Sequence, residues 1–541
     1  MFITKNQTTH HHFEFARIGS FYLDRFLNQG CSLLIFPAIV FILIILFCAN
    51  VFSQTNQKAY PELELKLSEV SAHLRFLASD ELMGRRTGTL GNNVAARYIA
   101  EQFRANGLTT LPGADDYFQK VQLQKSTPSK LNQVIFLGDT LRQGQDFVVR
   151  QPKAGELNTA IIFVDFGMVD QEKGRDDYAG RNVKNKIVVA KFGTPENTNR
   201  RSAFAAGSAK YQAAVEHGAL ALIELYAGQM PWQRLVYFMS RPRYTIVEKN
   251  TAESETEIPH ILVNDREQKY LTKISSTKSA ISASLFIHEP IQQIFTSPNV
   301  MGMIAGSNSN LRHETILLTA HFDHLGAGMR PGISPADTIF NGARDNGMGT
   351  VALLSAVKAL AEVRPARSVG CIAFTGEELG LLGSRFYGDH PLVPLNQTVF
   401  VLNADGGGYT DTSAVTVLGI ERSTAQVAIE NGCRVFNLGV IANPLTTRDL
   451  FNASDNIVFA RKGVPTVTFS PGFRTFDEEI RQFYHRPQDE ADENFNFQYL
   501  LKYCQGFAHS ARMIANMPDQ PHWQAGDEFE AVSKTLYQNH D

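Results

Sequence analysis

The chain has few cysteines for its length and no pair of them at short spacing. Its 541 residues include five cysteines, and no two form a Cys-x-x-Cys pair. They are Cys31, Cys48, Cys371, Cys433 and Cys504. A disulfide-stabilised scaffold needs closely patterned pairs, and a thiolate zinc site needs clustered cysteines. The sequence therefore excludes both classes.

Long basic tracts are also lacking. Lys and Arg number 51 against 54 Asp and Glu, which gives a net charge of −3, and no basic run is longer than Arg85-Arg86 or Lys184–Lys186. Nucleic-acid binding therefore has no electrostatic support. A hydrophobic content of 43% and a charged content of 19% are typical of a folded globular protein. The length exceeds one ordinary core, so two or three domains are expected.

One long hydrophobic run lies near the N-terminus. Residues 31–52 carry no charge, and Lys5, Arg17 and Arg25 precede them, as in the basic region of a signal peptide. Val51 and Ser53 fit a cleavage site after Ser53, so residues 1–53 are interpreted as a signal peptide. An uncleaved membrane anchor is the alternative, since a run of this length could span a bilayer. Both interpretations place the remaining chain outside the cytoplasm, in the periplasm or secreted, with membrane contact only if the segment stays uncleaved.

The composition changes at about residue 151 and again at about residue 290. The block 151–290 has strand and helix signals of its own but no cluster of histidines and acids. It resembles the protease-associated (PA) domain, a small β-rich module, through Asn182–Val189 and through the helix that ends at Glu216 and leads into Leu220–Ile223. The alternative is a generic αβ insertion without a partner role. Whether this block controls access to a site stays open.

The rest of the chain is interpreted as one main domain interrupted by that insertion. Residues 54–150 form its first part, 291–520 its larger part, and 521–541 a C-terminal tail. Short apolar runs alternate with amphipathic helices at 349–363 and 381–387. The expected strands are 300–305, 315–320, 369–375, 398–403, 414–418 and 464–470. Nearly continuous apolar strands favour an α/β fold with a mostly parallel or mixed sheet sandwiched by helices.

Acids and histidines follow these strands, at the edge where such sheets bind ligands. They are His321, Asp323, Asp345, Glu377, Glu378, Asp405 and His485. Each has an ordinary structural explanation when taken alone. Asp345 could cap the helix that follows it, Asp405 could belong to a turn, and His485 could lie on a surface loop. Their order at successive strand ends favours a shared metal site.

Two imidazoles and three carboxylates are a ligand set that suits Zn²⁺ and tolerates Mn²⁺ or Co²⁺. Five ligands exceed the needs of one tetrahedral zinc ion that keeps a water position, whereas two metals sharing one carboxylate use all five. Adjacent residues do not readily face one metal together. The pair Glu377-Glu378 therefore divides into one ligand and one general base.

These motifs resemble a specific family, the di-zinc aminopeptidases, whose relatives include glutaminyl cyclases and glutamate carboxypeptidases. The shared pattern is His-x-Asp, a Gly-x-x-Asp-Asn loop, Glu-Glu, Asn-x-Asp and Tyr-His, and members often carry an inserted PA domain. The resemblance implies two Zn²⁺ per chain, held by His321, Asp345, Glu378, Asp405 and His485. It implies that Asp345 bridges the metals and that Glu377 takes the proton of the attacking water. Asp323 would orient His321, and Tyr484 would stabilise the oxyanion.

Three residues near the motifs need comment. His324 is not expected in the site, because it points to the side opposite Asp323 if the strand continues. Arg344 stands where many members have another acid, which places a cation beside the metals unless a carboxylate pairs with it. Asn456 stands where Ser-Asp-His is the commoner sequence, so any role of that histidine is absent.

The resemblance implies an exported zinc exopeptidase, and an aminopeptidase acting on peptide or protein N-termini is the leading hypothesis. Glutaminyl cyclisation, carboxypeptidase activity and a non-catalytic, receptor-like homologue are the alternatives. The full ligand set disfavours glutaminyl cyclisation and the non-catalytic homologue. The preferred N-terminal residue and the oligomeric state stay open.

Overall fold

The computed structural model describes residues 64–196, 200–247, 257–277, 279–330, 332–446 and 449–538. The expected signal segment 1–53 lies outside these residues. Within the described ranges, no helix combines the length and apolarity needed to cross a membrane.

The main domain is built on a mixed nine-stranded sheet in the order β10-β1-β13-β17-β14-β18-β21-β19-β20. The strands are β10 (Arg243–Ile246), β1 (Phe118–Thr127), β13 (Ile291–Ile304), β17 (Ser368–Phe374), β14 (Thr315–His321), β18 (Thr398–Ala404), β21 (Thr466–Pro471), β19 (Ala414–Leu418) and β20 (Gly439–Ile441). The four central strands, β17, β14, β18 and β21, run parallel. The expected sheet class is confirmed.

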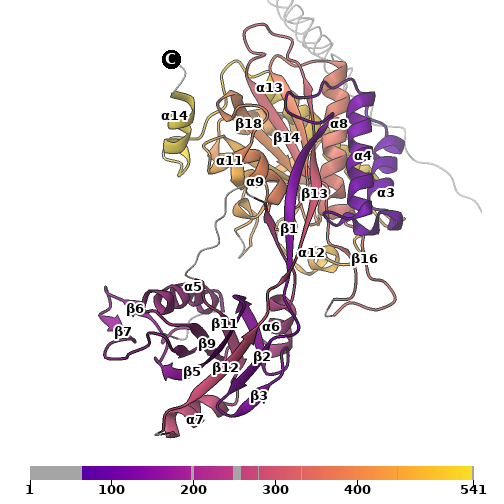
Figure 1. The fold of residues 1–541 in the computed structure, drawn as a ribbon. Coiled ribbons are helices and arrows are strands. Elements are labelled where there is room, and N and C mark those ends of the chain that lie inside the picture. The colour runs from indigo at the N-terminus through magenta and orange to yellow at the C-terminus, as the bar shows by residue number, and fades with distance from the viewer. Residues whose placement is uncertain are drawn as a thin grey trace, which may run out of the picture. The chain divides into compact units, whose positions relative to one another are not determined.

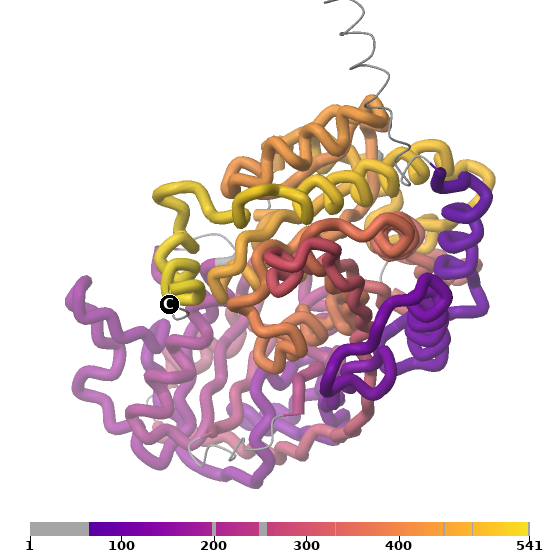
Figure 2. The backbone as a smooth tube through the Cα atoms, turned by 90° about the horizontal axis from the view of Figure 1, so that it is seen from above, coloured from indigo at the N-terminus to yellow at the C-terminus, as the bar shows by residue number. Residues whose placement is uncertain are grey.

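Helices cover both faces of this sheet, as Figures 1 and 2 show. One face packs on α3 (Leu67–Leu77), α4 (Leu90–Ala105), α8 (Met348–Glu362), α10 (Gln426–Arg434) and α13 (Phe497–Ala515). The other face packs on α9 (Leu382–Asp389), α11 (Asn456–Ala460) and α14 (Glu530–Gln538). Leu318 points into the first core and Leu317 into the second. Successive residues of a strand alternate between the two faces of the sheet, and both faces are covered here. Every residue of β14 is therefore buried, and its sequence is a continuous apolar run instead of an alternating one.

A second, eight-stranded sheet has the order β3-β2-β12-β5-β8-β9-β11-β4. Its strands are β2 (Gln133–Phe136), β3 (Asp139–Leu141), β4 (Phe147–Gln151), β5 (Gly155–Phe163), β8 (Ile187–Lys191), β9 (Ala221–Tyr226), β11 (His260–Asn264) and β12 (Ser282–Ile287), and its helices are α5 (Arg200–Glu216), α6 (Trp232–Met239) and α7 (Lys269–Ser276). It has its own apolar core, which is consistent with an inserted PA-like domain. The sheet begins before residue 151, because β2, β3 and β4 pair into it.

One segment of the insertion belongs to the main sheet. Strand β10 pairs antiparallel with β1, with Leu123 opposite Ile246. Tyr244 and Ile246 of β10 pack on an apolar cluster that includes Leu123 and Leu382. Strand β10 of the insertion therefore lies against the main domain.

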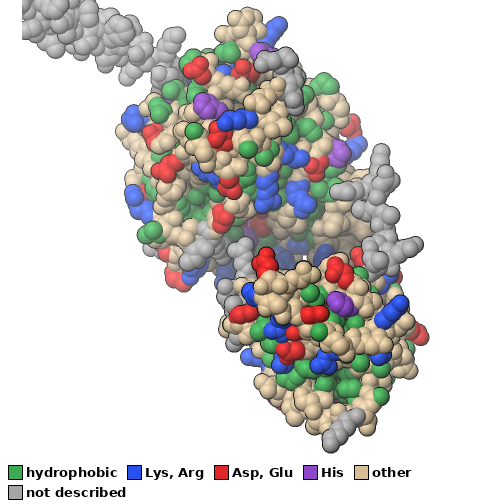
Figure 3. All heavy atoms as spheres, turned by 90° about the vertical axis from the view of Figure 1, so that its left-hand side faces the viewer, with side chains coloured by type: hydrophobic (Ala, Val, Ile, Leu, Met, Phe, Trp, Pro, Cys, Tyr) green, Lys and Arg blue, Asp and Glu red, His purple; other side chains and the backbone are tan. Residues whose placement is uncertain are grey.

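Short elements connect the strand ends. They are η2 (Asp80–Arg85), β6 (Val169–Asp170), β7 (Arg175–Asp176), β15 (Gly326–Ala327), β16 (Ile339–Phe340), η3 (Ala343–Gly347), η4 (Leu395–Gln397), η5 (Ile420–Arg422), η6 (Phe451–Ala453) and α12 (Glu478–Phe483). On the face drawn in Figure 3, acidic and basic side chains are interspersed.

Candidate metal centre

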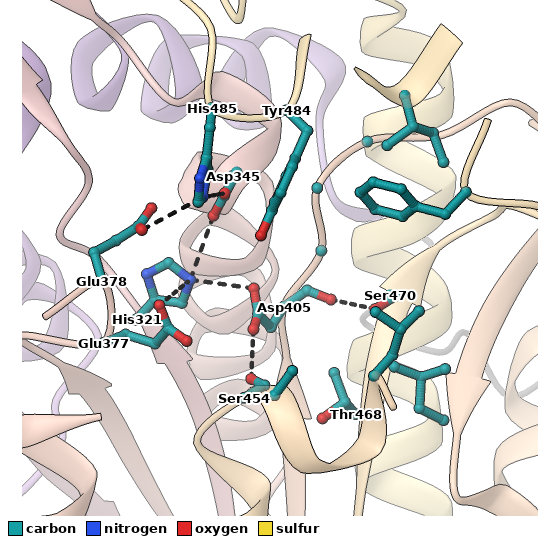
Figure 4. Close-up of a pocket in the computed structure, with 18 of the residues that line it drawn as sticks. His321, Asp345, Glu377, Glu378, Asp405, Ser454, Thr468, Ser470, Tyr484 and His485 are labelled. Atoms are coloured by element: carbon teal, nitrogen blue, oxygen red, sulfur yellow. Dashed lines mark hydrogen bonds and ion pairs between the residues drawn. The ribbon is translucent and has the colours of Figure 1, made fainter. Parts of the chain in front are cut away.

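His321, the last residue of β14, lies at the middle of a carboxylate cluster (Figure 4). Its Nε2 atom is 3.1 Å from Asp405 Oδ1, 3.5 Å from Asp345 Oδ1 and 3.9 Å from Glu377 Oε2. The ring is fully buried. Burial by itself lowers the pKa of His321, but these carboxylates raise it well above its ordinary value. The side chains from the ends of β14 and β18 and from the loop after β17 thus converge on one point.

Asp345 lies between the two predicted histidine ligands. Its Oδ1 atom faces His321 Nε2 at 3.5 Å, and its Oδ2 atom faces His485 Nε2 at 3.1 Å. The carboxylate is 6% exposed. Asp345 lies within η3, which directly precedes α8. A carboxylate that offers one oxygen to each of two histidines has the arrangement of a bridging metal ligand.

The second half of the cluster contains Glu378 and His485. Glu378 Oε2 is 3.4 Å from His485 Nε2. Burial raises the pKa of Glu378, but His485 and His324 lower it well below its ordinary range. Burial lowers the pKa of His485, whereas Glu378 and Asp345 raise it to about 10. These opposite shifts show one electrostatic unit of alternating acids and imidazoles.

His324 is a member of this half, and its expected exclusion was wrong. Its Nδ1 atom lies 2.8 Å from Glu378 Oε1 and 4.0 Å from Asp345 Oδ1. Strand β14 ends at His321, so the alternation of a strand does not apply to the residues that follow. The sequence signal was present, because the motif reads His-x-Asp-His.

The donor atoms fit two metal ions. Among the described residues, His321, Glu377 and Asp405 form one group of converging ligand atoms, and His324, Asp345 and Glu378 form another. Within the second group, His324 Nδ1 and Glu378 Oε1 lie 2.8 Å apart without hydrogen-bond geometry, and His324 Nε2 is buried without a hydrogen-bond partner. Buried polar atoms without a partner are costly, and a cation between them would remove that cost.

Asp323 connects the candidate base to the histidine. Its Oδ1 accepts the backbone N–H of Glu377 at 3.1 Å, and its Oδ2 accepts the hydroxyl hydrogen of Thr87 at 2.8 Å. His321 Nδ1 lies 3.2 Å from the Asp323 backbone oxygen and 3.8 Å from the carboxylate Oδ1. Asp323 therefore meets His321 through its backbone oxygen, and the carboxylate contact that the sequence predicted is too long for a hydrogen bond.

Tyr484 stacks on His485, with ring centroids 4.0 Å apart and an interplanar angle of 17°. A side chain at Gly407 would collide with the Tyr484 ring, which explains a glycine there. In Figure 4 the phenol group points toward Asp405. Burial, followed by the surrounding carboxylates, raises the pKa of Tyr484 far above its ordinary value, so its hydroxyl stays protonated and can donate a hydrogen bond.

A cavity of about 380 Å³ adjoins these groups. The ligand cluster forms one end, and the other end is largely apolar, as Figure 4 shows on the Ser470 side of Asp405. The apolar lining consists of Leu381, Leu418, Leu450, Ala453, Phe473, Phe476 and Ile480.

Two further residues support the site: Asp489, which carries no motif signal in the sequence, and Ser454, which begins the Ser-Asp-Asn segment. The Asp489 carboxylate accepts the backbone N–H groups of Arg344 and Asp345 at 2.9 and 3.1 Å, and also Nη1–H of Arg344 at 3.1 Å. Arg344 therefore pairs with a carboxylate, and its guanidinium lies 3.8 Å from the centre of the Phe483 ring. Ser454 donates its hydroxyl hydrogen to Asp405 Oδ2, which gives the Ser-Asp-Asn segment a role at the site.

Arg85 connects two segments that carry site residues. Its guanidinium is 1% exposed and donates to the carbonyl oxygens of Phe322 at 2.8 Å and Gly342 at 3.0 Å, and to those of Leu77 and Asn341. It thereby joins the segment after His321 to the loop that carries Asp345.

The sequence is similar to a known peptidase family and to known peptidases. Residues 299–503 match the model of peptidase family M28. The chain is 29% identical over 201 residues to aminopeptidase YwaD of Bacillus subtilis, covering 36% of this chain and 40% of that protein. It is 35% identical over 133 residues to the vacuolar membrane protease of Saccharomyces cerevisiae, covering 25% of this chain and 12% of that protein. The matches thus span less than half of these relatives.

A solved structure shares the fold. The aminopeptidase from Aneurinibacillus sp. strain AM-1 superposes with a TM-score of 0.55 at 17% identity, over 84% of this chain and 95% of that one. The matched family region contains every predicted metal ligand, from His321 to His485. Over residues 299–503, the chain therefore matches peptidase family M28.

Proposed function

We propose that this protein is a zinc-dependent aminopeptidase. The observation that carries the proposal is the position of Asp345, whose two oxygens face His321 and His485 at the end of a largely apolar cavity. Such a cavity can receive one side chain of a peptide while the cluster receives the adjoining amide bond. The similarity to aminopeptidase YwaD supports the same activity.

The residues divide naturally between two zinc ions. His321 and Asp405 would hold the first zinc ion, and Glu378 and His485 would hold the second. Asp345 would bind both ions, and His324 lies beside the second group of ligands. When bound, the metals polarise the substrate carbonyl and lower the pKa of water. The ligand atoms are imidazole nitrogens and carboxylate oxygens, which suits zinc.

Glu377 is the proposed general base and acid. Burial, with Asp405 and Glu378 nearby, raises the pKa of its carboxyl well above the ordinary value, although His321 opposes this shift. A carboxylate with a raised pKa takes a proton from the attacking water more readily, and then returns it to the leaving amine. Asp323 holds the Glu377 backbone in place through its N–H.

The remaining groups would orient the substrate. Asp405 and Glu377 supply negative charge for a protonated α-amine. Tyr484, which keeps its proton, would donate a hydrogen bond to the carbonyl oxygen as negative charge develops there. The apolar lining favours Leu, Phe or Met as the first residue of the substrate.

The test is hydrolysis of amino-acid p-nitroanilides by the full chain, with and without a chelator. We expect activity toward leucine p-nitroanilide, its loss on chelation and its recovery with Zn²⁺. Activity that is insensitive to chelation would overturn the proposal, as would cyclisation of N-terminal glutamine without peptide hydrolysis.

We also propose that residues 1–53 direct export and that the insertion is a PA domain. The uncharged run 31–52 after Lys5, Arg17 and Arg25 supports export. N-terminal sequencing of protein from the periplasm or medium tests it, with Gln54 expected as the first residue. Recovery of the full chain from the cytosol would contradict export.

A further inference from the structure

A second cavity adjoins the apolar lining of the cavity at the metal centre. Its volume is about 240 Å³, compared with about 380 Å³ for the first cavity. Among the described lining residues, Leu418 and Leu450 are the two that both cavities share. These two side chains, here called the leucine wall, therefore stand between the two cavities.

A close backbone contact brings the two leucines together. Leu418 is the last residue of β19 and lies opposite Thr468 of β21, which also lines the first cavity. The next residue, Gly419, has a φ of +82°, and a Cβ atom there would collide with the ring of Phe451. Phe451 directly follows Leu450 in the chain. Because a glycine lets the ring approach this backbone, the contact between Gly419 and Phe451 sets the wall in place.

Arg422 holds the Phe451 ring in this position. Its guanidinium lies 4.5 Å from the centre of the Phe451 ring, 4.9 Å from that of Phe529 and 5.4 Å from that of Trp523. The Arg422 side chain is 23% exposed and lines the second cavity. A guanidinium that is partly removed from water attracts the faces of aromatic rings, and so it keeps these rings in one arrangement.

The C-terminal tail supplies the partners that fix Arg422. Asp527 accepts hydrogen bonds from Nε at 2.7 Å and from Nη2 at 2.9 Å, and this bidentate geometry sets the plane of the guanidinium. The Arg422 carbonyl oxygen accepts the backbone N–H of Gln524 at 2.8 Å. Trp523 is 2% exposed and donates its Nε1–H to the Gly463 carbonyl oxygen at 3.1 Å. The tail is therefore packed onto the main domain next to the leucine wall.

The wall limits the length of the side chain that the first cavity can receive. In the proposed function, the first side chain of the substrate enters the apolar lining to which both leucines belong. Apolar pockets discriminate between side chains by size, by about 10–200-fold for one methylene group. A side chain that reaches past the wall must displace Leu418 or Leu450, and the contact between Gly419 and Phe451 opposes that movement.

We propose that Leu450, together with Leu418, determines the longest first residue that the enzyme accepts, and that Arg422 is a positioning residue that keeps this wall closed. The inference rests on the aminopeptidase function above and names its substrate class. Peptides that begin with Leu, Met or Phe are accepted, whereas peptides that begin with a longer aromatic side chain are rejected. The competing explanation is that the C-terminal tail contributes stability alone.

The experiment measures kcat/KM of the full chain for the p-nitroanilides of leucine and of 4-phenylphenylalanine, whose side chain is one ring longer than that of phenylalanine. We expect the wild type to prefer leucine by about tenfold or more. Leu450→Ala should join the two cavities and raise kcat/KM for 4-phenylphenylalanine by about tenfold or more, mainly through KM, without raising that for leucine. Equal values for the two substrates in the wild type, or an unchanged value for 4-phenylphenylalanine in Leu450→Ala, would overturn the proposal.

Leu445→Ala is the matched control for this variant. Leu445 is 77% exposed and belongs to neither cavity among the lining residues that the structure describes. The same truncation outside the wall should therefore leave both values of kcat/KM unchanged. A rise for 4-phenylphenylalanine equal to that in Leu450→Ala would contradict the assignment to the wall.

Arg422→Gln tests the positioning role. It should raise kcat/KM for 4-phenylphenylalanine relative to leucine by about threefold or more, with zinc content unchanged. A loss of stability alone lowers both values in proportion, and that result would overturn the positioning role. Arg474→Gln is the control, because Arg474 also pairs with an aspartate, Asp411, through two nitrogens, but its side chain is 70% exposed.

Cleavage of leucine p-nitroanilide by the wild type separates this inference from the proposed function. Cleavage that is accompanied by no change of selectivity in Leu450→Ala and Arg422→Gln rejects the inference alone. No cleavage by the zinc-loaded wild type rejects the proposed function, and the inference with it.

Discussion

The Asp489 carboxylate accepts the backbone N–H of Asp345 at 3.1 Å, so a residue outside every motif fixes the loop that carries the bridging ligand. Asp489 is fully buried and also pairs with Arg344. Residues that orient metal ligands typically change metal affinity by about 10–100-fold when removed.

Asp489→Asn should therefore weaken zinc binding by about tenfold or more, because the neutral amide holds Arg344 and the Asp345 backbone less firmly. Competition with a chromogenic chelator measures the affinity. Asp411→Asn is the control, since Asp411 pairs with Arg474 far from the ligand loop in sequence and does not line the cavity. Equal zinc affinity in the Asp489 variant and the wild type would refute the positioning role.

Glu377→Gln should reduce kcat by about 10²–10⁴-fold, because the amide cannot take the proton of water. Zinc content should stay near two per chain, since five other residues are the proposed ligands. Elemental analysis and steady-state kinetics on one preparation measure both. Loss of a metal together with activity would make Glu377 a ligand, as its place in the His321 group allows.

Ser454→Ala removes the hydroxyl that donates to Asp405 Oδ2. We expect weaker binding of the zinc held by His321 and Asp405, by about tenfold, with the second zinc retained. Titration of the metal-free variant with Zn²⁺, followed by calorimetry, separates the two steps. Ser413→Ala, whose hydroxyl binds Asp411 on the surface, should behave as the wild type. Two unchanged binding steps in Ser454→Ala would show that the contact is unimportant.

The insertion contains a buried charged network that makes its stability depend on pH. Glu224 accepts from Lys210 Nζ at 2.9 Å and lies 2.8 Å from His260 Nε2. Burial raises the pKa of Glu224, but His260 and Lys210 lower it to about 2. A folded-state pKa below the unfolded value stabilises the fold above about pH 4.5, and this contribution is lost as the pH falls toward 2.

Glu224→Gln should destabilise the protein by about 3–5 kcal/mol at pH 7, because Lys210 is left buried without its anion. The difference from the wild type should shrink by about 3 kcal/mol between pH 4.5 and 2, as the wild-type carboxylate becomes protonated. Urea unfolding across this range measures it. Glu216→Gln, at an exposed site on α5, is the control. A pH-independent difference would contradict the role assigned to Glu224.

The strand ends made much of the centre predictable. His321, Asp345, Glu378, Asp405 and His485 meet in space because parallel strands deliver their ends to one edge. His324 was misjudged because strand alternation was extended past the last paired residue.

Other features had no local signal. Asp489 and Arg85 act through backbone contacts with segments 144 and 237 or more residues away, and sequence spacing does not encode such contacts. The start of the second sheet before residue 151 depends on short strands whose partners lie more than a hundred residues later.

The most direct test of the central claim is mass spectrometry of the products from Leu-Gly-Gly-Phe and its N-acetylated form. The account predicts release of leucine from the free peptide first, no cleavage of the acetylated peptide, and no cleavage of either after zinc is removed. Release of phenylalanine first, or cleavage of the acetylated peptide, would contradict an aminopeptidase built on this centre.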